Sequence, residues 1–98
     1  MNLYLLHAGR LGYDTYSSAV VRAPDAETAR TIHPDGEQRW NGARWRVPAE
    51  WDDAAWTRPE HRSTTWVSHP DEVEVTLLGT AAPERSDTGV VLASFHAG

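Results

Sequence analysis

The tryptophans of this chain are gathered in one stretch, and this arrangement constrains the fold more than any other feature. All five lie in the segment 35–69, which has almost no other large apolar residue: Trp40, Trp45, Trp51, Trp56 and Trp66. Each indole buries about 150–250 Å², and a chain of 98 residues has few positions that enclose so large a side chain. We therefore expect two or three of Trp40, Trp45 and Trp66 to cover one face of a sheet. The others, with Trp51 and Trp56, are expected to lie partly exposed.

The first third of the chain predicts two strands and a helix. Residues 2–7 form a short apolar run and residues 17–22 carry β-branched side chains, so both segments are typical of strands. Residues 26–32 have the composition of a helix with Pro24 in its first turn and Asp25 near its positive end. The His-Pro pair that follows ends this helix, because the residue before a proline avoids helical backbone angles.

The last third predicts two further strands. Residues 72–77 alternate between acidic or polar and apolar side chains, which indicates a strand with one buried and one solvated face. Residues 89–95 are apolar on both faces, which is typical of a central strand covered by a helix on at least one side. The predicted fold class is therefore α+β, a small and mostly antiparallel sheet with one main helix packed on it.

The tryptophan-rich segment 35–69 is expected to be an irregular or hairpin insertion within a single domain, residues 1–98. Its Asn41-Gly42 pair is preferred by a type I′ turn. The pair predicts a hairpin in which residues 37–40 are antiparallel to residues 43–47.

The composition excludes several classes of function. Seven Asp and seven Glu face nine Arg and no Lys, which gives a net charge of −5. The absence of Lys excludes Schiff-base and P-loop lysine chemistry, and the absence of Cys excludes disulfides and thiolate ligands. An acidic chain repels a phosphate backbone, so direct nucleic-acid binding is not expected. No apolar run approaches the roughly 20 residues of a bilayer span, and no secretory signal is found, so we expect a cytoplasmic protein without membrane contact.

No motif indicates catalysis, a metal or a cofactor. The five histidines, at positions 7, 33, 61, 69 and 96, lack the short His-to-His spacing of many zinc sites. Ser68, His69 and Asp71 are the residue types of a hydrolytic triad, but triads are assembled from distant segments of a chain. His33 is expected to follow the helix and, when protonated, to interact with its negative end. We therefore expect a protein that is not an enzyme.

The residues best suited to bind a partner combine aromatic and acidic side chains, because aromatic residues concentrate the energy of protein interfaces. The predicted partner-binding residues are Glu50, Trp51, Asp52, Asp53, Trp56, Asp71, Glu72 and Glu74. The alternative is a module that sequesters a nucleotide signal, with Trp rings stacked on the base and arginines on the phosphate. A component of a virion or of its assembly is a third possibility.

Several segments resemble a group of small uncharacterised proteins encoded by bacteriophages and prophages. They lie towards the two ends of the chain and comprise residues 13–21, 32–34, 66–67, 73–81 and 89–98. The resemblance implies a small acidic accessory protein in the cytoplasm of a bacterial host, and it carries over no functional residue. Such a protein is expected to bind and block a host protein, as an anti-CRISPR or another anti-defence inhibitor does. Its negative charge would compete for the basic groove of a nucleic-acid-handling defence complex.

Overall fold

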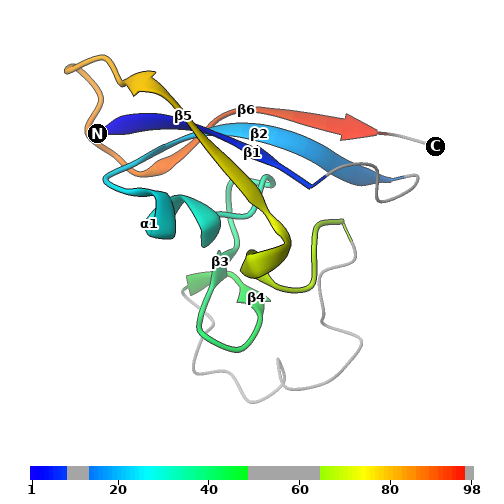
Figure 1. Ribbon diagram of the computed structural model, residues 1–98. Coiled ribbons are helices and arrows are strands. Elements are labelled where there is room, and N and C mark those ends of the chain that lie inside the picture. The colour runs from blue at the N-terminus through cyan, green and yellow to red at the C-terminus, as the bar shows by residue number, and fades with distance from the viewer. Residues whose placement is uncertain (9–13, 49–64, 97–98) are drawn as a thin grey trace.

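The computed structural model describes residues 1–8, 14–48 and 65–96 and contains a four-stranded antiparallel sheet (Figure 1). The strand order is β5-β1-β2-β6. The four strands are β1 (Asn2–His7), β2 (Thr15–Ala23), β5 (Glu74–Thr80) and β6 (Gly89–His96). The first strand has the predicted bounds, and the second extends beyond the predicted residues 17–22 at both ends.

The remaining elements lie on one side of this sheet, below it in Figure 1. They are the helix α1 (Ala26–Arg30), the small sheet of β3 (Arg39–Trp40) and β4 (Trp45–Arg46), and the 3-10 turn η4 (Pro70–Glu72). The prediction of an α+β fold is confirmed, although the helix has only five residues and the described structure is mostly β. Of the described elements, none covers the opposite face of the four-stranded sheet (Figure 1).

The core lies between the sheet and the elements below it. The register of β1 and β2 pairs Tyr4 with Val21 and Leu6 with Ala19, and these four side chains are buried. The other side of the core comes from α1, the residues directly after it, β4 and the segment before η4. Its side chains are Ala29, Ile32, Trp45, Trp66 and Val67.

The tryptophans within the described residues are part of this core. Trp45 and Trp66 are 3% and 4% exposed, and the half-buried Trp40 packs against the same cluster. Trp40, Trp45 and Trp66 thus cover the lower face of the sheet as predicted. The predictions for Trp51 and Trp56 lie outside the described residues.

The helix begins where its composition suggested, and Asp25 lies at its positive end as predicted. Asp25 is the N-cap, and the Asp25 Oδ1 accepts a hydrogen bond from the Thr28 N–H at 2.7 Å. This hydrogen bond holds the pKa of Asp25 below its usual value, since it favours the carboxylate. Pro24 therefore precedes the cap and does not lie in the first helical turn. Among the described residues, no helix is long and apolar enough to span a membrane.

His33 does not lie at the helix end, and this prediction was wrong. The helix ends at Arg30 with Thr31 as its C-cap, and the His33 side chain is completely buried. Its ring makes edge-on contacts with Tyr16 and Trp45, with centroids 6.0 and 5.5 Å apart. The backbone bridge between Ile32 and Arg39 turns the chain inward directly after the helix, and this places His33 in the core.

The predicted hairpin forms with a different turn. β3 and β4 pair through Arg39 with Arg46 and through Trp40 with Trp45. The Asn41 N–H donates to the Arg44 carbonyl, so Asn41 stands at the first position of the turn and Gly42 at the second. Gly42 has a φ of +102°, whereas Asn41 is not among the residues of positive φ. A type I′ turn with Asn41 and Gly42 as its central residues is therefore excluded.

The last two strands differ from their predictions. Glu72 belongs to η4, so the strand predicted from residue 72 begins at Glu74, and most of its side chains are exposed. β6 was predicted to be central because it is apolar on both faces, but it lies at one edge of the sheet. Both edge strands carry large exposed apolar side chains.

Candidate functional site

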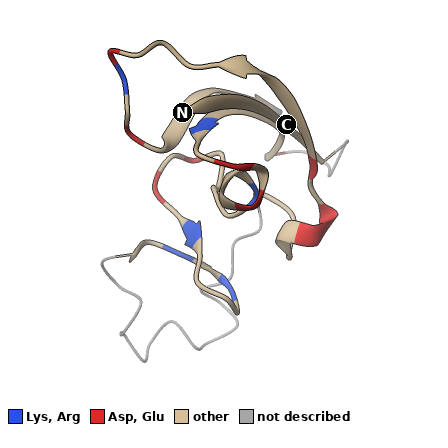
Figure 2. Cartoon of the chain, turned by 60° about the vertical axis from the view of Figure 1, so that its left-hand side comes forward, with Lys and Arg blue, Asp and Glu red and all other residues tan. Residues whose placement is uncertain are grey.

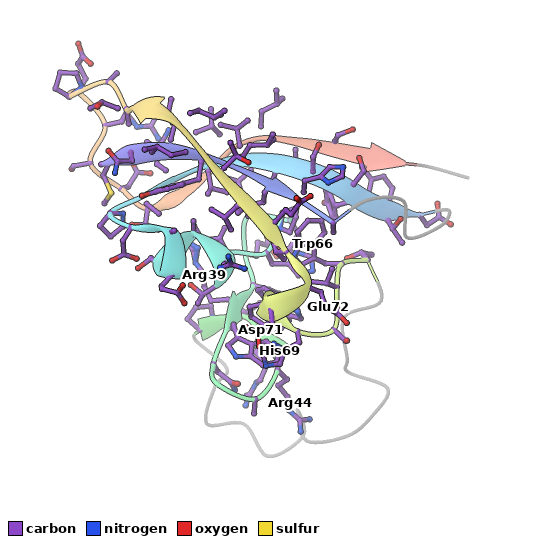
Figure 3. All side chains as sticks on the ribbon, viewed as in Figure 1. Arg39, Arg44, Trp66, His69, Asp71 and Glu72 are labelled. Atoms are coloured by element: carbon purple, nitrogen blue, oxygen red, sulfur yellow. The ribbon has the colours of Figure 1, made fainter. Side chains whose placement is uncertain are left out.

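Three of the predicted partner-binding residues lie together at one corner of the molecule, where η4 leads into β5. Asp71 and Glu72 belong to η4, Glu74 is the first residue of β5, and all three are exposed. Figure 2 shows the acidic residues of η4 at this corner, and Figure 3 shows Asp71 and Glu72 with His69 beside them. These three carboxylates therefore form an acidic corner, and a role in binding stays a prediction.

The local sequence explains why the chain turns here. His69 is the N-cap of η4, and its Nδ1 accepts a hydrogen bond from the Asp71 N–H at 3.1 Å. Pro70 occupies the first position of the turn, where its missing N–H is not needed. The buried side chain of Val73 then fixes the end of the turn in the core.

Further hydrogen bonds hold the acidic corner in place. The Ser68 N–H donates to the Glu72 Oε2 at 3.1 Å, and the Arg30 guanidinium donates to the Val73 carbonyl at 2.7 Å. Glu74 lies 3.5 Å from the His7 Nδ1 of the neighbouring strand. The corner is therefore connected to both α1 and β1, and its carboxylates project from a fixed backbone.

The aromatic core supports this corner from behind. The His69 ring lies 4.8 Å from the Trp40 ring, which in turn lies 5.4 Å from the Trp45 ring. An aromatic contact of this kind restrains both rings. The hairpin β3–β4 thus positions the residue that caps η4.

Beyond Glu74 the exposed surface of β5 includes two large apolar side chains. Leu77 is 61% exposed and Leu78 is 52% exposed. The register of β5 against β1 shifts between Leu3 and Tyr4, whose partners are Gly79 and Leu77, so Leu78 is the extra residue of a β-bulge. We refer to Asp71, Glu72, Glu74, Leu77 and Leu78 as the β5 strip.

The leucines of the β5 strip were missed by sequence reasoning. The alternation of residues 72–77 placed Leu77 on the buried face with Val73 and Val75. Leu77 does pair with the buried Tyr4, but β5 is an edge strand and has a neighbouring strand on one side only. The adjacent leucines before Gly79 break the alternation, and this is the one sequence signal of the bulge.

The other predicted partner-binding residues, Glu50, Trp51, Asp52, Asp53 and Trp56, lie outside the described residues. Their part in binding a partner therefore stays a prediction.

The described tryptophans offer little ring surface to a nucleotide. Trp45 and Trp66 are buried, and the half-buried Trp40 contacts the rings of both Trp45 and His69. Arg39 lies near them, and burial lowers its pKa against the opposing influence of Asp35. The alternative of a nucleotide-sequestering module therefore depends on Trp51 and Trp56.

The buried Arg39 Nη1 and Trp66 Nε1 atoms lack a hydrogen-bond partner within the described residues. Arg39 still donates from Nη2 to the Thr88 carbonyl at 3.2 Å.

Within the described ranges, no three His, Asp or Glu side chains gather closely enough to hold a metal ion.

No protein-family model, curated protein or solved structure matches this chain. The resemblance to phage and prophage proteins therefore stays a prediction.

Proposed function

We propose that this protein is a non-enzymatic inhibitor that binds a host protein through the β5 strip and blocks it. The proposed setting is the cytoplasm of a bacterial host, and the proposed class is that of phage-encoded anti-CRISPR or other anti-defence proteins. The setting and class rest on the resemblance of the sequence segments, and the binding surface rests on the geometry of β5 and η4.

The observation that carries this proposal is that exposed carboxylates and exposed leucines follow one another along η4 and the edge strand β5. Charged groups at an interface steer association and select the partner, whereas apolar side chains that leave water supply affinity. Asp71, Glu72 and Glu74 provide the first property, and the exposed Leu77 and Leu78 provide the second.

The chemistry of the strip favours one kind of partner. Three carboxylates on a chain of net charge −5 favour a basic surface. A groove that holds DNA or RNA is such a surface, so the proposed partner is a nucleic-acid-handling protein whose groove the strip occupies. The protein itself has no need to contact nucleic acid.

The test compares two triple variants with equal changes of charge. Asp71→Asn, Glu72→Gln and Glu74→Gln remove the charges of the β5 strip and keep the side-chain shapes. Glu27→Gln, Glu37→Gln and Glu84→Gln remove three exposed charges elsewhere, so both variants change the net charge from −5 to −2. Each protein is immobilised, exposed to host lysate, and its retained proteins are quantified by mass spectrometry.

We expect one host protein to be retained by the wild type and the control variant, with binding by the strip variant weakened about ten- to a hundredfold. The retained protein, once purified, should lose nucleic-acid binding when the wild type is added. Retention of the same proteins by all three baits, or of none by the wild type, would overturn the proposal. Capture without loss of nucleic-acid binding would overturn the blocking role.

A further inference from the structure

We infer that two copies of this chain associate through β6, whose free edges pair antiparallel about a two-fold axis and extend the sheet to eight strands. The surface concerned is the edge of the sheet opposite to the β5 strip. The inference is independent of the proposed function, because it uses no residue of that strip.

The first argument is the contrast between the composition of β6 and its position. The strand reads Gly-Val-Val-Leu-Ala-Ser-Phe-His, with apolar side chains on both faces, as in strands that are buried on both sides. Yet it lies at the sheet edge in the described structure, with Leu92 68%, Val91 48% and Phe95 47% exposed. A long uncharged edge strand readily pairs with another strand.

The two edges of the sheet differ in how they prevent such pairing. β5 carries Glu74, a bulge at Leu78 and Gly79 at a φ of +157°, all of which disfavour a regular neighbour. β6 has no acidic residue, no arginine and no proline. Its register against β2 shifts twice, with Val91 as an extra residue near the start of β6 and Ser17 as an extra residue of β2 near the other end. The stretch of β6 between these two shifts, Leu92 to Ser94, pairs regularly with β2 and carries no charged side chain.

A second copy fits this edge because no like charges meet there. Antiparallel self-pairing places identical strands together, which would be unfavourable for a charged edge. The nearest acidic residue before β6, Asp87, is bound to Arg22 and Arg85 at 3.1 and 3.2 Å. β5 lies three strand spacings from β6, about 14 Å, and physiological salt screens charges beyond about 8 Å. The net charges of two copies therefore do not oppose the contact strongly.

The uncovered face of the sheet supplies a complementary shape. A hollow of about 200 Å³ lies beside β6 on this face, lined by Leu5, Ser18, Ala19, Val20, Leu92, Ala93 and Ser94. Side chains that pair directly across two strands share one face. A two-fold axis at Ala93 places Leu92 of the second copy opposite Ser94, about 5 Å away. Leu92 of the second copy then covers the rim of the first copy's hollow, beyond the small Ser94. By symmetry, Leu92 of the first copy covers the hollow of the second.

The chain contains no cysteine, so single cysteines can report this arrangement. Ala93→Cys is expected to form a disulfide between two copies under mild oxidation, because the axis brings the two Cβ atoms close to disulfide range. Thr76→Cys on the exposed opposite edge is the control and should remain largely uncrosslinked. The readout is the mass of the protein on a non-reducing gel and by mass spectrometry.

Sedimentation equilibrium on the full chain gives the second measurement. The wild type should have twice the mass of the chain, and Leu92→Arg should raise the dimer dissociation constant roughly tenfold or more, since each copy brings a charge to the edge. Leu77→Arg, a matched change at a similarly exposed leucine on β5, should leave the dimer intact. Circular dichroism verifies that both variants are folded.

A monomeric wild type at the highest soluble concentration would overturn the inference. So would a dimer that persists unchanged in Leu92→Arg, or the absence of a disulfide in Ala93→Cys. These outcomes are separate from those of the capture experiment, which depends on the β5 strip.

Discussion

His33 and Asp35 form a buried polar centre that fixes the chain between α1 and β3. The Asp35 N–H donates to the His33 Nδ1 at 3.0 Å, and the Asp35 Oδ1 lies 3.3 Å from the same nitrogen. The Asp35 carboxylate also accepts from the N–H groups of Glu37 and Gln38 at 2.8 and 2.9 Å. Burial opposes ionisation of Asp35, but the hydrogen bonds from His33, Gln38 and Glu37 hold its pKa well below the usual value.

Asp35→Asn tests this centre. The pKa of Asp35 is depressed in the folded protein, so its carboxylate contributes fully above the unfolded pKa of about 3.9 and loses that contribution as the pH falls further. At pH 7 we expect Asp35→Asn to lower the free energy of unfolding by about 1 kcal/mol. The change removes the charge that accepts these hydrogen bonds, and because this charge is partly exposed the loss is modest. The variant should also lose less stability than the wild type between pH 5 and pH 2, in urea denaturation. An exposed-site control, Glu37→Gln, should keep the wild-type pH dependence.

The β3–β4 hairpin is held by a side chain of its own turn. The Asn41 Oδ1 accepts hydrogen bonds from the N–H groups of Ala43 and Arg44 at 2.8 and 2.9 Å. Asparagine commonly replaces a backbone carbonyl in this way. The hairpin matters to the rest of the molecule because it carries Trp40, on which the cap residue His69 of the acidic corner rests.

Asn41→Ala removes both of these acceptor contacts. We expect the change to lower the free energy of unfolding by about 1 kcal/mol, since the side chain is near the surface and water replaces part of the loss. Asn41→Asp retains the acceptor oxygen and should lose less than half as much. Thermal unfolding followed by circular dichroism measures both, and equal losses in the two variants would contradict the role of Oδ1.

Trp45 joins the segments that lie below the sheet to one another. Its side chain is 3% exposed, and its Nε1–H donates to the Val67 carbonyl at 2.7 Å. Its ring also contacts the rings of His33 and Trp40. One side chain thus connects the hairpin, the segment after α1 and the segment that leads to η4.

Trp45→Phe should destabilise the fold more than Asp35→Asn or Asn41→Ala does. It reduces the buried volume and leaves the Val67 carbonyl without its donor, for an expected loss of about 2–4 kcal/mol in the free energy of unfolding. Trp40→Phe, at a half-buried position, should lose clearly less. Urea denaturation followed by far-ultraviolet circular dichroism compares the two tryptophan variants, and similar losses would show that Trp45 has no special connecting role.

Neighbouring residues in the chain specify much of this protein. The apolar run of residues 2–7 becomes β1, Asp25 caps the helix, and the charges of Asp71, Glu72 and Glu74 predict an acidic surface. These features depend on backbone preference, periodicity and charge, which act over a few residues. They include the fold class and three residues of the candidate site.

Contacts between distant segments decide the rest. The burial of His33, the exposure of Leu77 and the edge position of β6 all depend on which elements lie beside them in space. An apolar strand has the same local pattern whether another strand covers its edge or not. The strand order β5-β1-β2-β6 leaves the apolar β6 at the edge, and that order follows from packing across the whole fold.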